Sequence, residues 1–123
     1  MHAIHWFEIP TTDLARAKTF YGSVLGISEF RHEQGGPMTM AIFPYDHAAD
    51  GVGGALVQGG PLTPSKTGVV IYLNAGTDLK GAVERAIQAG GSVRRPITDI
   101  GDPGSIALIE DLEGNVVGLH QPR

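Results

Sequence analysis

Two segments of the chain repeat apolar side chains at steps of three and four residues, which is the spacing of one face of an α-helix. The stripes consist of Leu14, Ala17, Tyr21, Val24 and Leu25, and of Leu79, Ala82, Val83, Ala86 and Ile87. Thr12 or Asp13 precedes the first stripe, and Thr77 or Asp78 precedes the second. Such side chains accept hydrogen bonds from the free amides of a first helical turn. Gly26 and Gly90-Gly91 follow the stripes and favour helix termination there. The pattern therefore predicts two helices.

Shorter runs of apolar and β-branched residues surround the two stripes and predict strands. These runs cover residues 4–9, 29–33, 38–43, 52–58, 69–74, 93–97, 105–110 and 116–120. The run at 105–110 has four consecutive apolar residues, which predicts a strand buried on both faces. The order strand, helix and three strands occurs twice, and a shift of 65 positions carries Asp13-Leu14 onto Asp78-Leu79. We therefore predict one α+β domain of two βαβββ modules, residues 1–60 and 67–123, joined by a turn-rich linker.

Composition narrows the functional classes. The chain has 123 residues, 41% of them hydrophobic and 18% charged, which is typical of a single folded domain. The net charge of −4 argues against a nucleic-acid partner, because such proteins present a basic surface. Cysteine is absent, which excludes disulfides and thiolate metal sites. No apolar run approaches the ~20 residues that span a bilayer. We expect a cytoplasmic protein with no membrane partner.

Two stretches carry a resemblance to a known superfamily. Residues 6–17 are followed by Phe20-Tyr21 and Val24-Leu25-Gly26, and residues 109–120 contain Asp111-Leu112-Glu113-Gly114-Asn115 before a last strand. Their order and spacing resemble the vicinal oxygen chelate superfamily, which includes glyoxalase I, bleomycin- and fosfomycin-resistance proteins and extradiol dioxygenases. The resemblance implies paired modules whose curled mixed sheets enclose a cup, lined by the first and last strands of each module. It also implies a small-molecule ligand and, for a chain this short, a homodimer.

In the metal enzymes of this superfamily, a His on the first strand and a Glu or His on the last strand of each module bind a divalent cation. Substrate oxygens then bind at the open coordination positions of that cation, which acts on them as a Lewis acid. In this sequence the corresponding positions are Trp6, Ile71 and Gly118, and residues 54–58 contain no His, Asp or Glu. The resemblance therefore gives no support for a metal cofactor. A shift of one residue in register would bring His5 to the first position, so a displaced metal site stays open.

Candidate site residues follow from the alternation of side chains along a strand. If Trp6 faces the cup, Glu8 faces it too, and Gly118 and His120 share a face of the last strand. Glu8 and His120 are the candidate catalytic groups, because a desolvated carboxylate or an imidazole can act as a general acid or base. Alternatively, Glu8 pairs with Arg94 or Arg95, and His120 is a surface or interface residue.

Candidate ligand-binding residues complete the predicted site. Trp6 would supply an aromatic wall, although it is also consistent with a core or dimer contact, and Gly118 stands where the resemblance places a last-strand carboxylate. On the first strand of the second module, Ile71 and Leu73 are expected to share the cup face, and Tyr72 lies where it could touch a ligand. We expect a cup between the modules that binds a small molecule without the usual divalent metal.

Two enzymatic alternatives remain. One is a metal-independent enzyme that uses Glu8 and His120 on a small carbonyl compound. The other is a metal-dependent lyase, isomerase or dioxygenase whose ligands lie elsewhere. A buried Glu8 without a charged partner would favour catalysis, and an apolar cup without titratable groups would favour binding alone.

Overall fold

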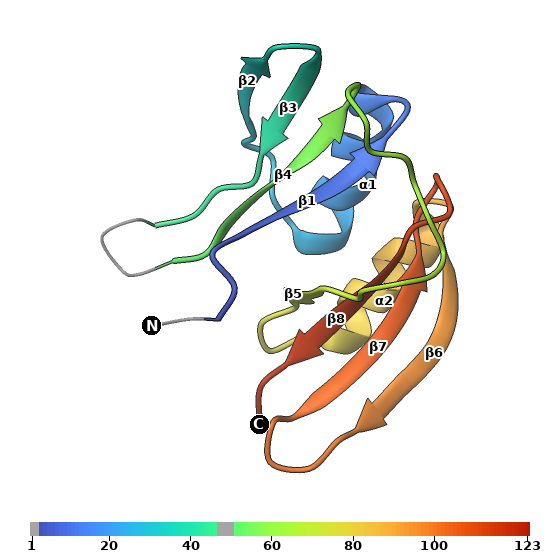
Figure 1. The fold of residues 1–123 in the computed structure, drawn as a ribbon. Coiled ribbons are helices and arrows are strands. Elements are labelled where there is room, and N and C mark those ends of the chain that lie inside the picture. Colours follow the sequence, from blue (N-terminus) through green and yellow to red (C-terminus); the bar gives the residue numbers. More distant parts are fainter. Residues whose placement is uncertain (1–2, 47–50) are drawn as a thin grey trace.

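Each half of the chain folds into a four-stranded mixed sheet with one helix against it (Figure 1). The computed structural model describes residues 3–46 and 51–123. The first module contains β1 (Trp6–Thr11), α1 (Leu14–Leu25), β2 (Arg31–Gly35), β3 (Met38–Ile42) and β4 (Gly53–Gln58). The second contains β5 (Tyr72–Asn74), α2 (Leu79–Gln88), β6 (Ser92–Asp99), β7 (Ser105–Glu110) and β8 (Val116–Gln121). The predicted α+β class and the repeated βαβββ order are confirmed.

Both sheets have the same topology. Their strand orders are β1-β4-β3-β2 and β5-β8-β7-β6, so the first and last strands of each module are parallel neighbours. The sheets remain separate and do not close into one barrel. Some strand bounds differ from the sequence prediction. β1 extends to Thr11, because Thr11 still pairs with Gln58, and β5 begins only at Tyr72.

The two helices begin in the same way. The Asp13 carboxylate accepts from the Arg16 amide at 3.1 Å, and the Asp78 carboxylate accepts from the Gly81 amide at 3.0 Å. Each helix also receives a cap from the last strand of its own sheet, which the sequence analysis missed. Leu14 N donates to Gln58 Oε1 at 2.8 Å, and Leu79 N donates to Gln121 Oε1 at 2.9 Å. These bonds satisfy amides that have no partner within the helix.

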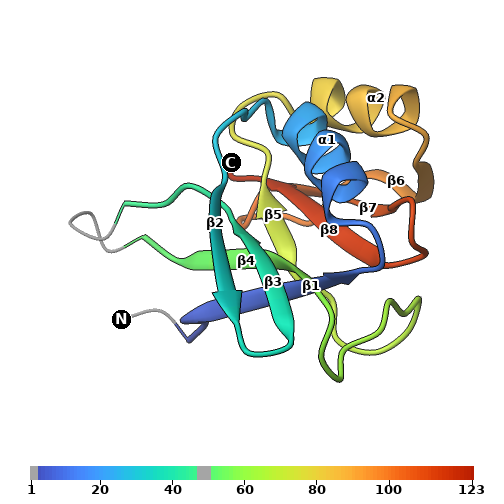
Figure 2. The ribbon, with the colours of Figure 1, turned by 90° about the horizontal axis from the view of Figure 1, so that it is seen from above.

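One hydrophobic core runs through both modules. The helices pack on the inner face of each sheet and against each other, and Figure 2 shows them on the same side of the sheets. The largest fully buried side chains are Tyr21, Phe20, Leu56, Ile109, Leu119, Val24 and Val57. Strand β7 is buried on both faces as predicted, with Ile106 on one face and Ala107 on the other. In residues 3–46 and 51–123, neither helix is long and apolar enough to span a membrane.

Buried and partly buried hydrogen bonds join the two modules. Asp111 Oδ2 accepts from the Tyr21 hydroxyl at 2.7 Å, and Asn115 Nδ2 donates to the Pro10 carbonyl at 2.8 Å. Burial, together with the negative charge of Asp111, raises the pKa of Tyr21 well above its ordinary value. Because Tyr21 is neutral, its hydroxyl proton is available for this bond. The turn after β7 is thereby fixed to the helix of the first module.

Glu113, in the same turn, binds the start of α1. Its carboxylate accepts from the Thr12 amide at 2.7 Å, from the hydroxyls of Thr11 and Thr12, and from the Arg16 guanidinium. Burial of the carboxylate would raise its pKa, but these hydrogen bonds outweigh burial, and the pKa of Glu113 lies below its ordinary value. A negative charge is also favourable at a helix N-terminus. Glu113 therefore stabilises the contact between modules as an anion.

Candidate functional site

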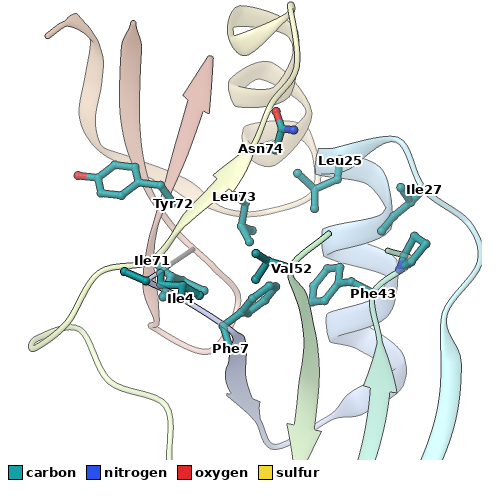
Figure 3. A pocket seen from close by; sticks show the side chains of 12 residues that line it. Ile4, Phe7, Leu25, Ile27, Phe43, Val52, Ile71, Tyr72, Leu73 and Asn74 are labelled. Carbon is teal, nitrogen blue, oxygen red and sulfur yellow. The ribbon is translucent and has the colours of Figure 1, made fainter. Parts of the chain in front are cut away.

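A pocket of about 580 Å³ lies where the two modules meet, beside the C-terminal end of α1 (Figure 3). Its walls are mainly apolar side chains, namely Ile4, Phe7, Leu25, Ile27, Phe43, Val52, Ile71 and Leu73. Tyr72 and Asn74 also line it. No Asp, Glu, Lys, Arg or His is present among the described residues that line the pocket. The site therefore offers apolar surface and a few neutral polar groups.

The pocket is the open end of the shared core. Phe7 lies on the inner face of β1, with its ring centroid 5.5 Å from that of Phe43. Phe7 also covers Gly54, where an added Cβ would fall 2.2 Å from its ring. Leu73 lies on the inner face of β5, beside Leu119. Phe7 and Leu73 thus form walls from different modules, and the space between the modules stays open here.

Two of the predicted site residues, Trp6 and Glu8, lie on the outer face of the first sheet. The Trp6 indole Nε1 donates to Glu8 Oε2 at 3.3 Å, and both side chains are exposed. The Trp6 ring also lies edge-to-face with the Tyr45 ring, with 6.3 Å between the ring centroids. Glu8 is not the buried carboxylate that a desolvated general base requires. The alternative pairing with Arg94 is also absent, because Arg94 forms an ion pair with Glu110 at 3.1 Å.

Three more candidates lie on the outer face of the second sheet, namely Tyr72, Gly118 and His120. Tyr72 pairs with Gly118, and Asn74 pairs with His120. His120 Nε2 donates to the Pro103 carbonyl at 2.6 Å. The expectation that Leu73 shares this face is wrong, because Leu73 pairs with Leu119 on the inner face and is only 6% exposed. The prediction assigned the cup face by counting from Ile71, which lies before β5 begins. Because side chains alternate along a strand, this starting point gave Leu73 the opposite face from the one that it has.

The six predicted residues therefore do not form one site. Trp6 and Glu8 share one sheet face, and Tyr72, Gly118 and His120 share another. Of the six, only Tyr72 and Leu73 line the pocket. Sequence reasoning missed Phe7, Phe43 and Leu25, because their apolar pattern is the same as that of residues filling the core. Only their position at the open end of the core distinguishes them.

The positions that the resemblance gives to metal ligands do not fit a divalent cation. Trp6 and Tyr45 cover Gly53, and Tyr72 covers Gly118, so each of these two places holds aromatic rings over a glycine. Indole and glycine offer no side-chain lone pair for a metal ion. Within residues 3–46 and 51–123, no three side chains of His, Asp or Glu lie close enough together to hold a metal.

Comparisons with known proteins agree with this fold. A sequence model of the Glyoxalase/Bleomycin resistance protein/Dioxygenase superfamily matches residues 3–119. "Putative glyoxylase CFP32" of Mycobacterium bovis is 32% identical over 124 residues, covering 95% of this chain and 44% of the relative. The chain thus spans less than half the length of that relative.

Two solved structures extend the comparison. Glyoxalase I from Zea mays superposes with a TM-score of 0.70 at 22% identity, over 94% of this chain and 44% of that one. TnmS3, an antibiotic binding protein from Streptomyces sp. CB03234, superposes with a TM-score of 0.67 at 26% identity, over 100% of this chain and 98% of that one. The maize enzyme shares the fold, and TnmS3 matches along nearly its whole length. With its repeated modules and the match over residues 3–119, the chain belongs to the Glyoxalase/Bleomycin resistance protein/Dioxygenase superfamily.

Proposed function

We propose that this protein binds a small, uncharged organic molecule in the pocket between its modules and needs no metal ion to do so. The observation that carries the proposal is the lining of the pocket, whose side chains are mainly apolar and, among the described residues, uncharged, with polar atoms also exposed in it. Its volume of about 580 Å³ is typical of small-molecule sites. Burial of apolar ligand surface would supply the binding energy, at about 25 cal/mol per Å².

Among the described residues, the same lining offers no carboxylate, imidazole or amine for proton transfer, and Tyr72 is its one titratable side chain. A general acid or base must lie within hydrogen-bond reach of the atom that it protonates or deprotonates. The two catalytic candidates, Glu8 and His120, lie on outer sheet faces and do not line the pocket. Binding without turnover is therefore the function that the geometry supports best.

The comparison with TnmS3 favours the same function. That protein is described as antibiotic binding, and the two chains superpose over nearly their full lengths. Sequestration of a small organic compound is accordingly the biological role that we propose. A homodimer and a cytoplasmic location remain predictions from the sequence. Light scattering of the purified protein tests the first of them.

One pair of variants tests the pocket. In Ile71→Trp the larger side chain occupies pocket volume, whereas Val69→Trp places the same side chain two residues away at a position that is 94% exposed. The neutral aromatic dye 1-N-phenylnaphthylamine serves as the probe, with binding followed by its fluorescence. We expect one saturable site per chain, weakened roughly tenfold by Ile71→Trp and unchanged by Val69→Trp. Saturable binding that Ile71→Trp leaves intact, or no saturable binding, would overturn the proposal.

A further inference from the structure

The hydrogen bonds between the two modules are distributed unevenly around α1. The turn at residues 111–115 forms hydrogen bonds near the start of the helix, with Pro10, Thr11, Thr12 and Arg16. It also accepts a hydrogen bond from the Tyr21 hydroxyl. At the last turn of α1, the hydrogen bonds described between modules all come from Arg85 of α2. Beyond the apolar packing of α1 on α2, the described hydrogen bonds between the modules thus involve many groups at one end of α1 and one side chain at the other.

Arg85 binds backbone carbonyls of the other module. Its Nε donates to Ser23 O at 3.0 Å and to Val24 O at 3.2 Å, and its Nη2 donates to Val24 O at 3.1 Å. Carbonyls in the last turn of a helix have no partner within the helix, and a cation is favourable there. Arg85 Nη1 also lies 3.7 Å from the carboxylate of Asp78, the residue that caps α2. The guanidinium therefore connects the end of α1 with the body of α2.

The segment that Arg85 holds leads directly into the pocket wall. Val24 is followed by Leu25 and then, after the left-handed Gly26, by Ile27. Leu25 and Ile27 both line the pocket, and Leu73 of the second module lines it as well (Figure 3). Arg85 itself does not line the pocket. The Arg85 contacts therefore lie one residue before a pocket wall of the first module, opposite a wall of the second.

We propose that Arg85 is a positioning residue that sets the width of the pocket, and thereby the size of the molecule that the pocket accepts. The inference rests on the proposed binding function and adds to it the determinant of ligand size. Without the three hydrogen bonds, only apolar packing holds the end of α1 against α2, so the pocket can widen and admit a bulkier molecule.

The test compares Arg85→Met with Glu113→Gln. Methionine keeps an unbranched side chain and removes the donors, whereas Glu113→Gln weakens the contact between modules at the opposite end of α1. The readout is the ratio of dissociation constants for 1-N-phenylnaphthylamine and the smaller 1-naphthylamine. We expect Arg85→Met to shift this ratio roughly tenfold in favour of the larger probe. A difference of one methylene group in an apolar pocket has an effect of this size. We expect Glu113→Gln to lower Tm and leave the ratio unchanged. An unchanged ratio in Arg85→Met, or an equal shift in both variants, would overturn the inference.

Hydrogen exchange separates failure of this inference from failure of the proposed function, because it needs no ligand. In Arg85→Met, amides of residues 22–27 should exchange faster while those at the start of α1 keep their protection, and Glu113→Gln should give the opposite pattern. If neither probe binds the wild-type protein, the proposed function and the ligand-size inference both fall. If the probes bind but residues 22–27 keep their protection, only the role of Arg85 falls. If Arg85→Met does not fold, Arg85→Lys replaces it. Lysine keeps the charge but lacks the branched guanidinium, so it should change both readouts in the same direction.

Discussion

The phenol ring of Tyr72 lies over Gly118 of the neighbouring strand so closely that a Cβ added at Gly118 would fall 2.1 Å from the ring. The first module repeats this arrangement, with the Trp6 ring 2.9 Å from a Cβ added at Gly53. These places lie on the outer faces of the sheets, and Trp6 and Gly118 are two of the positions that the superfamily resemblance gives to metal ligands. Aromatic packing on glycine thus occupies the place of a coordination site.

The Tyr72–Gly118 contact predicts a coupled effect on stability. Gly118 is not among the glycines with positive φ, so Gly118→Ala should act through crowding and not through backbone strain. We expect Gly118→Ala to displace the Tyr72 ring and to cost about 1–3 kcal/mol of unfolding free energy. In a Tyr72→Ala background the same substitution should cost less, because the crowding is gone. Urea unfolding of the four proteins measures the coupling, and additive effects would show that the ring does not restrain Gly118.

The lack of fit for a metal gives a second prediction. A ligand that binds only the native state raises its apparent stability by mass action. We therefore expect Tm to stay the same when Ni²⁺, Zn²⁺ or Mn²⁺ is added in excess over the protein, and also after treatment with EDTA. A saturable rise in Tm that is lost in His5→Ala would contradict this prediction and would restore the displaced site with His5 as a ligand.

Glu113 predicts how stability depends on pH. Its folded-state pKa is lowered, so its contribution is fully present above the unfolded-state pKa of about 4.3 and is lost as pH falls through the folded-state value. The difference in stability between wild type and Glu113→Gln should therefore be largest above about pH 5 and should shrink in acid. Thermal unfolding of both proteins across this range measures the difference. If it were constant down to the most acidic pH, the carboxylate charge would not be what holds the turn against α1.

Much of the fold could be predicted from local patterns. Asp13, Asp78 and the left-handed Gly26 mark helix ends through bonds formed within a few residues, and the structure contains those bonds. Strand ends were less accurate, because the neighbouring strand decides them. Thr11 belongs to β1 only because Gln58 lies beside it. The caps from Gln58 and Gln121 were missed for the same reason, since each joins residues more than 40 positions apart.

The site was harder to predict than the fold. The alternation of side chains predicted that Trp6 shares a face with Glu8, and that Gly118 shares one with His120, and the structure agrees. The same argument gave Leu73 the wrong face. It also could not show that these residues lie on outer faces and the pocket at the open end of the core. That distinction depends on how the two modules pack, which involves Arg85 and Glu113 and has no signature within either segment alone.

The most direct test of the proposed function locates the bound molecule. Methyl-labelled protein is titrated with 1-N-phenylnaphthylamine, and chemical shifts are followed by NMR. We expect saturable shifts to concentrate on pocket methyls such as those of Ile27, Ile71 and Leu73, while the methyls of Ile42 and Val57 on the outer face of the first sheet change little. Shifts that concentrate on Ile42 and Val57, with the pocket methyls unaffected, would contradict the account and place binding on the outer sheet face beside Trp6 and Glu8.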